Sequence, residues 1–186
     1  MRIIAGAWRG RPLLAPAGHA TRPTSDRARE ALFSMLHSRL GSFEGLEVAD
    51  LFAGTGALGL ESLSRGAARC TFVEKDSAAV KALRSNIAAL GAEARAEIRQ
   101  QDAVRVAGGP WHLVLLDPPY GSGLGTQALA ALVNGNALAP NAIVSLETTP
   151  AEETAVPGLT LEAERRYGKA KITLLRADGT PSMDVG

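Results

Sequence analysis

The residues best suited to chemistry form a short run, Asp117-Pro118-Pro119-Tyr120, directly after the apolar stretch 113–116. Proline lacks an N–H group and fixes φ, so the chain must leave a sheet at this point. The turn then holds a carboxylate, free carbonyls and an aromatic ring at the carboxyl edge of a strand, where open α/β sheets bind ligands. Such a set can accept hydrogen bonds from the amino group of a planar base and stack on its face. A proline-rich turn with a surface tyrosine is the alternative for this run alone.

A second motif lies earlier in the chain. Residues 54–59 read Gly-Thr-Gly-Ala-Leu-Gly and open a predicted helix, and Glu74 follows 20 residues after Gly54. This G-x-G-x-x-G pattern with a later acid is the fingerprint of a dinucleotide site. Glycines let a ligand approach a helix N-terminus, and a carboxylate can bind ribose hydroxyls. A nicotinamide dinucleotide and S-adenosylmethionine both fit this motif.

Two further acids separate these cofactors. Asp50 lies four residues before the first glycine, where it would repel a pyrophosphate but suit an ammonium group such as that of S-adenosylmethionine. Asp102 ends the third predicted strand and could accept from an adenine amino group. Asp50, Glu74, Asp102 and Asp117 are therefore expected along one sheet edge. Capping of a helix or turn explains any one of them, but four like charges in register imply a ligand that donates hydrogen bonds.

The formal net charge of +1 hides an uneven distribution. Residues 1–40 hold seven arginines against two acids, whereas residues 41–186 hold 13 Lys/Arg against 17 Asp/Glu. A basic arm on a mildly acidic body indicates a polyanionic partner at one end, although a solvated basic surface is the alternative. In a predicted hairpin over residues 2–14, an exposed Trp8 could stack on unpaired bases while its neighbouring arginines meet phosphates. Equally, Trp8 could pin the hairpin to the body. The predicted RNA contacts are Arg2, Trp8, Arg9, Arg11, Arg22 and Arg27.

The amino-acid composition limits the classes of protein to which the chain can belong. A chain of 186 residues with 46% hydrophobic residues is long enough for one domain with a real core. The single Cys70 excludes an internal disulfide framework and favours a reducing cytoplasm, where it would be a small core residue. The sequence has no membrane-length apolar run, no secretory signal and no metal-ligand spacing, so we expect a cytoplasmic protein without a metal site.

The remaining pattern alternates strands and helices. We expect a helix over 25–40, strands over 46–52, 69–73, 94–99, 111–116 and 142–146, and helices from the glycine motif to Gly66, from Asp76 to Gly91 and over 124–133. Such alternation predicts an α/β fold, with a mostly parallel sheet and helices on both faces. A hairpin over 160–165 and 171–175, turning at Gly168, would leave one antiparallel strand at an edge.

With these motifs in place, the sequence resembles class I S-adenosylmethionine-dependent methyltransferases. It is most similar to the bacterial family that methylates N2 of a guanine in small-subunit (16S) ribosomal RNA. The likeness runs over nearly the whole chain. The glycine loop marks only the superfamily, Asp-Pro-Pro-Tyr narrows it to methylation of amino groups, and the Arg-Pro-Thr-Ser-Asp-Arg entry to the first helix is the most family-specific. The matching segments are 2–6 with Arg9-Gly10, 22–27 with 29–33, 50–56, 73–75, 117–120 and Tyr167-Gly168.

The resemblance implies a Rossmann-like, seven-stranded sheet whose last strand is antiparallel. It implies a basic RNA-binding arm over residues 1–22 and a methyltransferase domain over 23–186. In this family Tyr120 would stack on the guanine, Asp117 would accept from its N2, Glu74 would bind the ribose, and Asp102 with Ala103 would bind the adenine. The implied catalytic residues are Asp117, Pro118, Pro119 and Tyr120. The implied cofactor contacts are Thr24, Asp50, Phe52, Ala53, Gly54, Thr55, Gly56, Glu74, Lys75, Asp102, Ala103 and Asp117.

The implied partner is small-subunit ribosomal RNA, within an assembling or assembled subunit, with the protein as a monomer. Two segments depart from the family pattern: residues 104–110 are short, and the stretch after Thr148 is too rich in Pro and Glu for a long helix, which leaves the bounds of the sixth strand open.

Three alternative functions remain. An N6-adenine or other amino-group methyltransferase of DNA or RNA shares the Asp-Pro-Pro-Tyr chemistry, although the DNA enzymes usually carry a larger target-recognition domain. The others are a nicotinamide dehydrogenase and a non-catalytic RNA-binding assembly factor.

Overall fold

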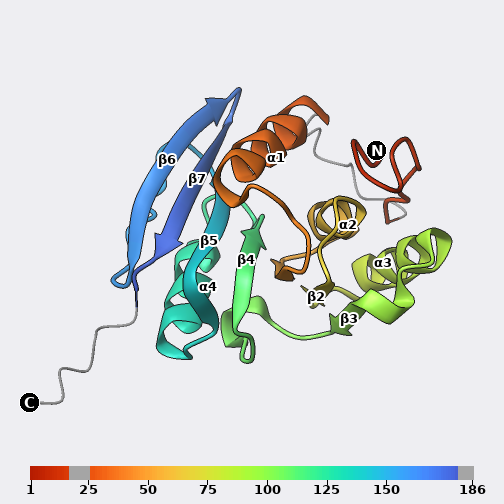
Figure 1. Ribbon diagram of the computed structural model, residues 1–186. Coiled ribbons are helices and arrows are strands. Elements are labelled where there is room, and N and C mark those ends of the chain that lie inside the picture. Colours follow the sequence, from red (N-terminus) through yellow and green to blue (C-terminus); the bar gives the residue numbers. More distant parts are fainter. Residues whose placement is uncertain (17–25, 180–186) are drawn as a thin grey trace, which may run out of the picture.

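The computed structural model describes residues 1–16 and 26–179 (Figure 1). The predicted alternation of helices and strands is present. The helices are α1 (Asp26–Leu40), α2 (Ala57–Ser64), α3 (Ser77–Leu90) and α4 (Leu124–Asn134), with 3₁₀ turns η1 (Glu93–Arg95) and η2 (Ala103–Arg105). The strands are β1 (Glu47–Leu51), β2 (Arg69–Val73), β3 (Ala96–Arg99), β4 (Trp111–Leu116), β5 (Leu138–Thr148), β6 (Leu159–Tyr167) and β7 (Ala170–Ala177).

The strands form one seven-stranded sheet in the order β3-β2-β1-β4-β5-β7-β6. Strands β1 to β5 are parallel to one another, while β7 is antiparallel to both β5 and β6. The expectation that the antiparallel strand would lie at an edge is therefore wrong: β7 is inserted between β5 and β6. The burial pattern explains this order, because β7 is buried on both faces whereas most side chains of β6 are exposed. A strand that is apolar on both faces needs cover on both sides and gains it inside the sheet.

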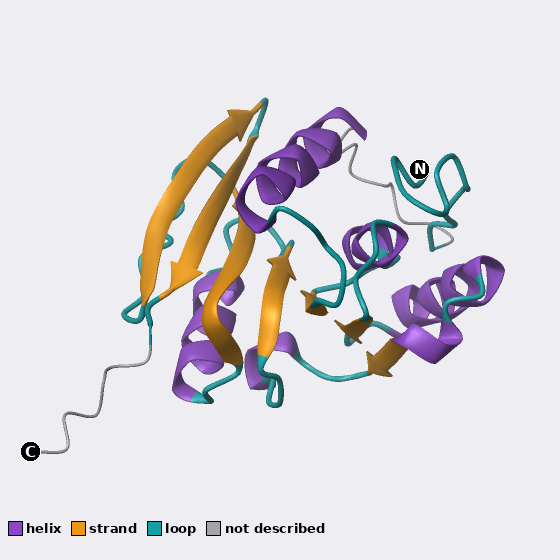
Figure 2. Ribbon diagram, viewed as in Figure 1, coloured by secondary structure: helices purple, strands orange, loops and turns teal. Residues whose placement is uncertain are grey.

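Helices lie on both faces of the sheet (Figure 2), and an apolar core fills the space on each face. Successive side chains of a strand point to opposite faces, so Leu113 and Leu115 of β4 belong to one core and Val114 and Leu116 to the other. Helices α1, α2 and α3 contribute to the first core, which also contains the fully buried Phe33. Helix α4 and the turn η2 contribute to the second. The sheet is thus covered on both faces, and its carboxyl edge is left for the loops.

Local signals account for the element ends that were predicted well. The Asp76 side chain accepts from the N–H of Ala79 at 2.9 Å and begins α3, and Gly91 ends it with φ 66°. Strand β3 is shorter than expected because residues 93–95 form η1 instead. Strand β5 is longer than expected and includes an irregular register against β4 between Trp111 and Leu113. No helix interrupts residues 149–158, as their composition indicated.

The arm formed by residues 1–16 reverses direction as predicted but contains no regular strands. Only an isolated bridge joins Arg2 to Pro12, since Pro12 has no N–H group with which to extend a ladder. The arm lies against α2 near its C-terminal end. Ala7 donates a backbone hydrogen bond to the carbonyl of Ser64 at 2.8 Å. At Gly6 a Cβ atom would lie 1.9 Å from that carbonyl oxygen, so only glycine permits this close approach.

Trp8 is half-buried, so the expectation of an exposed indole is wrong. Its side chain packs against the core beneath α1, α2 and α3, and the Arg95 guanidinium lies 5.5 Å from its ring centroid. The pinning role considered for this residue therefore matches the structure.

Arg22 and Thr24 lie outside the described residues. Cys70 is buried in the core, as expected. In the part of the chain that the structure describes, no helix is long and apolar enough to cross a membrane.

Candidate active site

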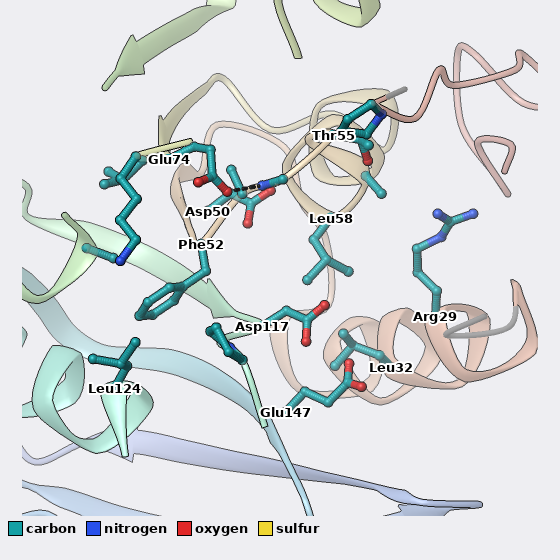
Figure 3. A pocket seen from close by; sticks show the side chains of 18 of the residues that line it. Arg29, Leu32, Asp50, Phe52, Thr55, Leu58, Glu74, Asp117, Leu124 and Glu147 are labelled. Atoms are coloured by element: carbon teal, nitrogen blue, oxygen red, sulfur yellow. Dashed lines mark hydrogen bonds between the residues drawn. The ribbon is translucent and has the colours of Figure 1, made fainter. Parts of the chain in front are cut away.

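A cavity of about 350 Å³ opens at the carboxyl edge of the parallel strands. The ends of β1, β2, β4 and β5 all contribute side chains to it, and α1 forms part of its wall (Figure 3). The four acids expected along this edge all line the cavity, which confirms the prediction that they lie together at one edge of the sheet. They are Asp50, Glu74, Asp102 and Asp117.

The glycine loop lies against α2 and β2. Gly54 and Gly56 have φ values of 57° and 83°, which only glycine adopts readily. The third glycine has a different role: a Cβ atom on Gly59 would lie 2.4 Å from the ring of Phe72 on β2. The first two glycines therefore shape the loop, and the third allows α2 to pack closely on the sheet.

Glu74 holds this loop in place as well as lining the cavity. Its Oε1 accepts from the N–H of Gly54 at 2.9 Å (Figure 3). Its Oε2 accepts from the N–H of Asp76 at 3.0 Å. A carboxylate has about four acceptor sites, so two remain for a ligand. The capping role and the ribose-binding role considered for Glu74 are thus compatible.

Phe52 adopts a strained backbone at the mouth of the loop. Its φ of 60° is unusual for a bulky residue and costs of order 1–3 kcal/mol. The strain turns the chain so that Phe52 and Ala53 line the cavity, and the N–H of Ala53 donates to the carbonyl of Val73 at 3.0 Å. In Figure 3 the Phe52 ring lies between Glu74 and Leu124. Strain of this kind concentrates at ligand sites.

Asp50 is the most deeply buried acid of the cavity, with 1% of its surface exposed. Its Oδ2 accepts from the N–H of Gly59 at 2.9 Å. Burial raises the pKa of Asp50 well above its ordinary value, and the nearby Asp117 and Glu74 raise it further, against the opposing effect of the Gly59 hydrogen bond. A cationic ligand group near Asp50 would remove much of this electrostatic cost.

The Asp-Pro-Pro-Tyr run follows β4 as predicted and turns away from the sheet. Asp117 is half-buried, and its carboxylate points into the middle of the cavity (Figure 3). Pro118 is buried, whereas Pro119 is exposed and its carbonyl accepts from the Ser122 hydroxyl at 2.6 Å. No described residue donates to the Pro118 carbonyl. Tyr120 is half-buried, and its hydroxyl is anchored by a hydrogen bond to a carboxylate at the end of β5.

The end of the cavity beyond β3 is formed by Lys75, Gln101, Asp102 and Ala103. The Asp102 side chain accepts from the N–H of Val104 at 3.1 Å and begins the turn η2. Only one of its oxygens is used in this contact. Ala103 is buried beside it, which gives this end of the cavity a small apolar floor next to hydrogen-bonding groups.

Two charged side chains of the cavity were missed as site residues. Glu147 is the penultimate residue of β5 and is 8% exposed, and it could have been found because it directly follows the predicted strand 142–146. Arg29 was counted only as one of the seven arginines of residues 1–40. It is instead 4% exposed, and its guanidinium donates to the Arg2 carbonyl and to Asp26. Of the predicted RNA contacts within the described residues, Arg2, Arg9, Arg11 and Arg27 are exposed.

This strand order, with an antiparallel β7 inserted beside β5 and a glycine loop after β1, is that of the class I methyltransferase fold. The family model described as "Conserved hypothetical protein 95" matches residues 1–176. The chain belongs to this family.

Named relatives agree with that assignment. The "Ribosomal RNA small subunit methyltransferase D" of Haemophilus influenzae is 37% identical over 175 residues, which is 90% of this chain and 89% of the relative. The protein of the same name from Escherichia coli K12 is 40% identical over 151 residues, which is 80% of this chain and 74% of the relative. The resemblance to small-subunit ribosomal RNA methyltransferases is confirmed.

Solved structures show the same fold. The "Putative methyltransferase yhhF from Escherichia coli" superposes with a TM-score of 0.85 at 36% identity, over 96% of this chain and 98% of that one. A more distant RNA methyltransferase from Salinibacter ruber, solved with S-adenosyl-L-homocysteine, gives a TM-score of 0.66 at 16% identity, over 89% of this chain and 99% of that one. The latter likeness concerns the fold alone.

Proposed function

We propose that this protein transfers a methyl group from S-adenosylmethionine to the exocyclic N2 of a guanine in small-subunit ribosomal RNA. The observation that carries the proposal is the position of the Asp-Pro-Pro-Tyr turn, which follows β4 and places Asp117 and Pro119 in the wall of an acid-lined cavity. The relatives named as small-subunit ribosomal RNA methyltransferases support the substrate class. The choice of N2 rests on the Asp-Pro-Pro-Tyr run and the likeness to the guanine-N2 family.

The cavity fits the proposed cofactor in size and chemistry. Its volume of about 350 Å³ lies within the range of ligand pockets, and its acids call for a ligand rich in hydrogen-bond donors. Asp50 would hold the ammonium group and Glu74 the ribose hydroxyls. Asp102 and the Ala103 backbone would hold the adenine. When bound, S-adenosylmethionine supplies an electrophilic methyl group on a sulfonium.

The protein residues would make the base amine reactive. The Asp117 carboxylate and the Pro118 carbonyl can accept its N–H groups, which favours a pyramidal nitrogen and balances the positive charge that develops during transfer. Tyr120 would stack on the base and hold it flat. No strong general base is required, because a methylated ammonium loses its proton readily. Orientation of the amine could supply up to roughly 7–11 kcal/mol of the rate enhancement.

The arm supplies the proposed RNA contact. Arg2, Arg9 and Arg11 are exposed on it, and the arm is fixed to α2 rather than loose. Fixed cations lose little conformational freedom when they meet phosphates, which strengthens their binding to a polyanion.

The test is transfer of a labelled methyl group to three acceptors: small ribosomal subunits lacking the modification, naked small-subunit RNA, and duplex DNA. Label recovered as N2-methylguanine from RNA or subunits supports the proposal. Label on DNA alone would retain the cofactor but overturn the RNA substrate. A protein that binds the cofactor but labels none of the three would instead fit a non-catalytic assembly factor.

A further inference from the structure

The cavity holds few cations to match its acids. Five carboxylates line it, namely Asp50, Glu74, Asp102, Asp117 and Glu147, whereas its cations among the described residues are the side chains of Arg29 and Lys75 and the amino terminus at Met1. The proposed cofactor carries an ammonium and a carboxylate on its methionyl part. Its carboxylate could not lie among unpaired acids, so its position must be close to one of these cations. The amino terminus belongs to the Arg29 end of the cavity, because Arg29 donates to the Arg2 carbonyl.

Lys75 is at the wrong end for this role. It follows Glu74 directly and shares its end of the cavity with Gln101 and Asp102, where the ribose and adenine are proposed to bind. In Figure 3, Glu74 lies to one side of Asp50 and Arg29 to the other. A ligand with its ribose on Glu74 and its ammonium on Asp50 therefore extends toward Arg29.

Arg29 also has bonding capacity to spare. It lies in the first turns of α1, on the same side as the cavity-lining Ala28 and Leu32. Both of its hydrogen bonds to described residues use one nitrogen, Nη2, which donates to the Arg2 carbonyl and to Asp26. Its Nε is buried and has no hydrogen-bond partner. An unsatisfied donor on a buried cation is costly, so its retention at a cavity wall needs a reason.

We propose that the Arg29 guanidinium binds the carboxylate of the methionyl part of the cofactor while Asp50 binds its ammonium. This inference rests on the proposed function. The two Nη2 contacts fix the side chain beforehand, so the guanidinium is already oriented. Since Nη2 holds the first residues of the arm, the same side chain joins the cofactor site to the RNA-binding arm.

The test compares ligands that differ in the amino-acid part. S-adenosylhomocysteine carries both charged groups, decarboxylated S-adenosylmethionine keeps only the ammonium of that part, and 5′-methylthioadenosine has neither. We expect Arg29→Gln to weaken S-adenosylhomocysteine binding at least about tenfold in calorimetry, as for loss of a charge-assisted hydrogen bond. The affinity of Arg29→Gln for decarboxylated S-adenosylmethionine and for 5′-methylthioadenosine should change less than about twofold. Arg29→Lys should recover most of the lost affinity, because it keeps the charge.

Arg84→Gln on the exposed face of α3 is the matched control, because it removes an arginine that does not line the cavity. Unchanged binding of 5′-methylthioadenosine shows that a variant is folded. If Arg29→Gln does not fold, the comparison is made with Arg29→Lys. Equal losses for all three ligands, or no loss, would overturn the carboxylate assignment alone. A wild-type protein that binds none of the three would overturn the proposed cofactor and this inference with it.

Discussion

The hydroxyl of Tyr120 donates a hydrogen bond of 2.7 Å to Oε1 of Glu147. This bond joins the turn after β4 to the end of β5, where Glu147 lines the cavity. It gives the buried Glu147 carboxylate a donor and fixes the orientation of the tyrosine ring. The ring proposed to stack on the guanine is thus held in place before any base arrives.

Replacement of Tyr120 separates these two roles. Tyr120→Phe keeps the ring but leaves Glu147 without this donor, so we expect a loss of about 1–3 kcal/mol in the free energy of unfolding and a small change in methyl transfer. Tyr120→Ala also removes the stacking surface, worth about 1–3 kcal/mol per base, and should lower kcat/KM by about ten- to a hundredfold. Urea denaturation measures the free energy of unfolding, and steady-state kinetics with the RNA substrate measure kcat/KM. Equal kinetics for the alanine variant and the wild type would remove the stacking role.

Asp117 is expected to act on the substrate amine rather than on cofactor binding. Asp117→Ala removes the carboxylate that points into the cavity, and we expect transfer to fall by at least about 10²–10³-fold. Affinity for S-adenosylhomocysteine, measured by calorimetry, should stay near that of the wild type. A variant with wild-type turnover would end the assignment of Asp117.

The sequence predicted the parts of the fold that depend on local signals. Strands β2 and β4 have the predicted bounds because each is a short, mostly apolar run between turns. Helix α3 has a capping residue at each end, Asp76 and Gly91, that can be recognised in the sequence. The position of β7 could not be predicted in this way. It depends on which strand is covered on both faces, and this is decided by packing across the whole sheet.

The candidate site was predicted to a similar extent. Asp50 and Asp117 could be placed because acids at the ends of parallel strands must meet at one edge. Arg29 could not, because a basic residue in an amphipathic helix is normally exposed, and its burial, with a hydrogen bond to the Arg2 carbonyl, depends on tertiary packing. The two roles of Trp8 were left open for the same reason: its cover comes from residues far away in the sequence.

Asp50 makes ligand binding depend on pH. Because its pKa is raised in the folded protein, the folded state holds this proton more tightly than the unfolded chain does. Its contribution to stability is therefore full below the unfolded pKa of about 3.9 and falls as the pH rises toward the folded pKa. A ligand ammonium favours the carboxylate, so over this window binding should release a proton and tighten as the pH rises.

Calorimetry of S-adenosylhomocysteine binding, in buffers of different ionisation enthalpy, measures the number of protons released. Asp50→Asn should abolish the release, and 5′-methylthioadenosine, which lacks the ammonium, should show none with the wild type. Proton release that persists in Asp50→Asn would assign it to another group.

Glu61 should determine whether the arm stays attached. Its buried carboxylate accepts from the N–H groups of Ile4 and Ala5 at 2.9 and 3.0 Å and pairs with Arg65 at 3.0 Å. We expect Glu61→Ala to lower the free energy of unfolding by about 3 kcal/mol and to expose the arm to trypsin. The exposed Glu93 provides a control, since Glu93→Ala removes an acid that has no such contacts. An arm that resists trypsin equally in both variants would show that other contacts suffice to hold it.

The arm arginines should differ in their importance for RNA binding. Arg2 and Arg11 donate to the carbonyls of Gly10 and Ala89, whereas the Arg9 side chain is exposed and has no hydrogen bond or ion pair with any described residue. Arg9 is thus the freest to meet a phosphate. Arg9→Ala should weaken RNA binding and reduce the slope of log K against log salt by about 0.7–0.9, the value for one phosphate contact.

Arg69→Ala provides the matched control, because Arg69 is exposed at the start of β2, on the edge of the sheet opposite the cavity. Affinity for a small-subunit RNA fragment, measured at several salt concentrations, should show the reduced slope for Arg9→Ala and the wild-type slope for Arg69→Ala. The same slope in both variants would mean that the arm does not contact phosphates, and that the RNA must instead approach the cavity from another side.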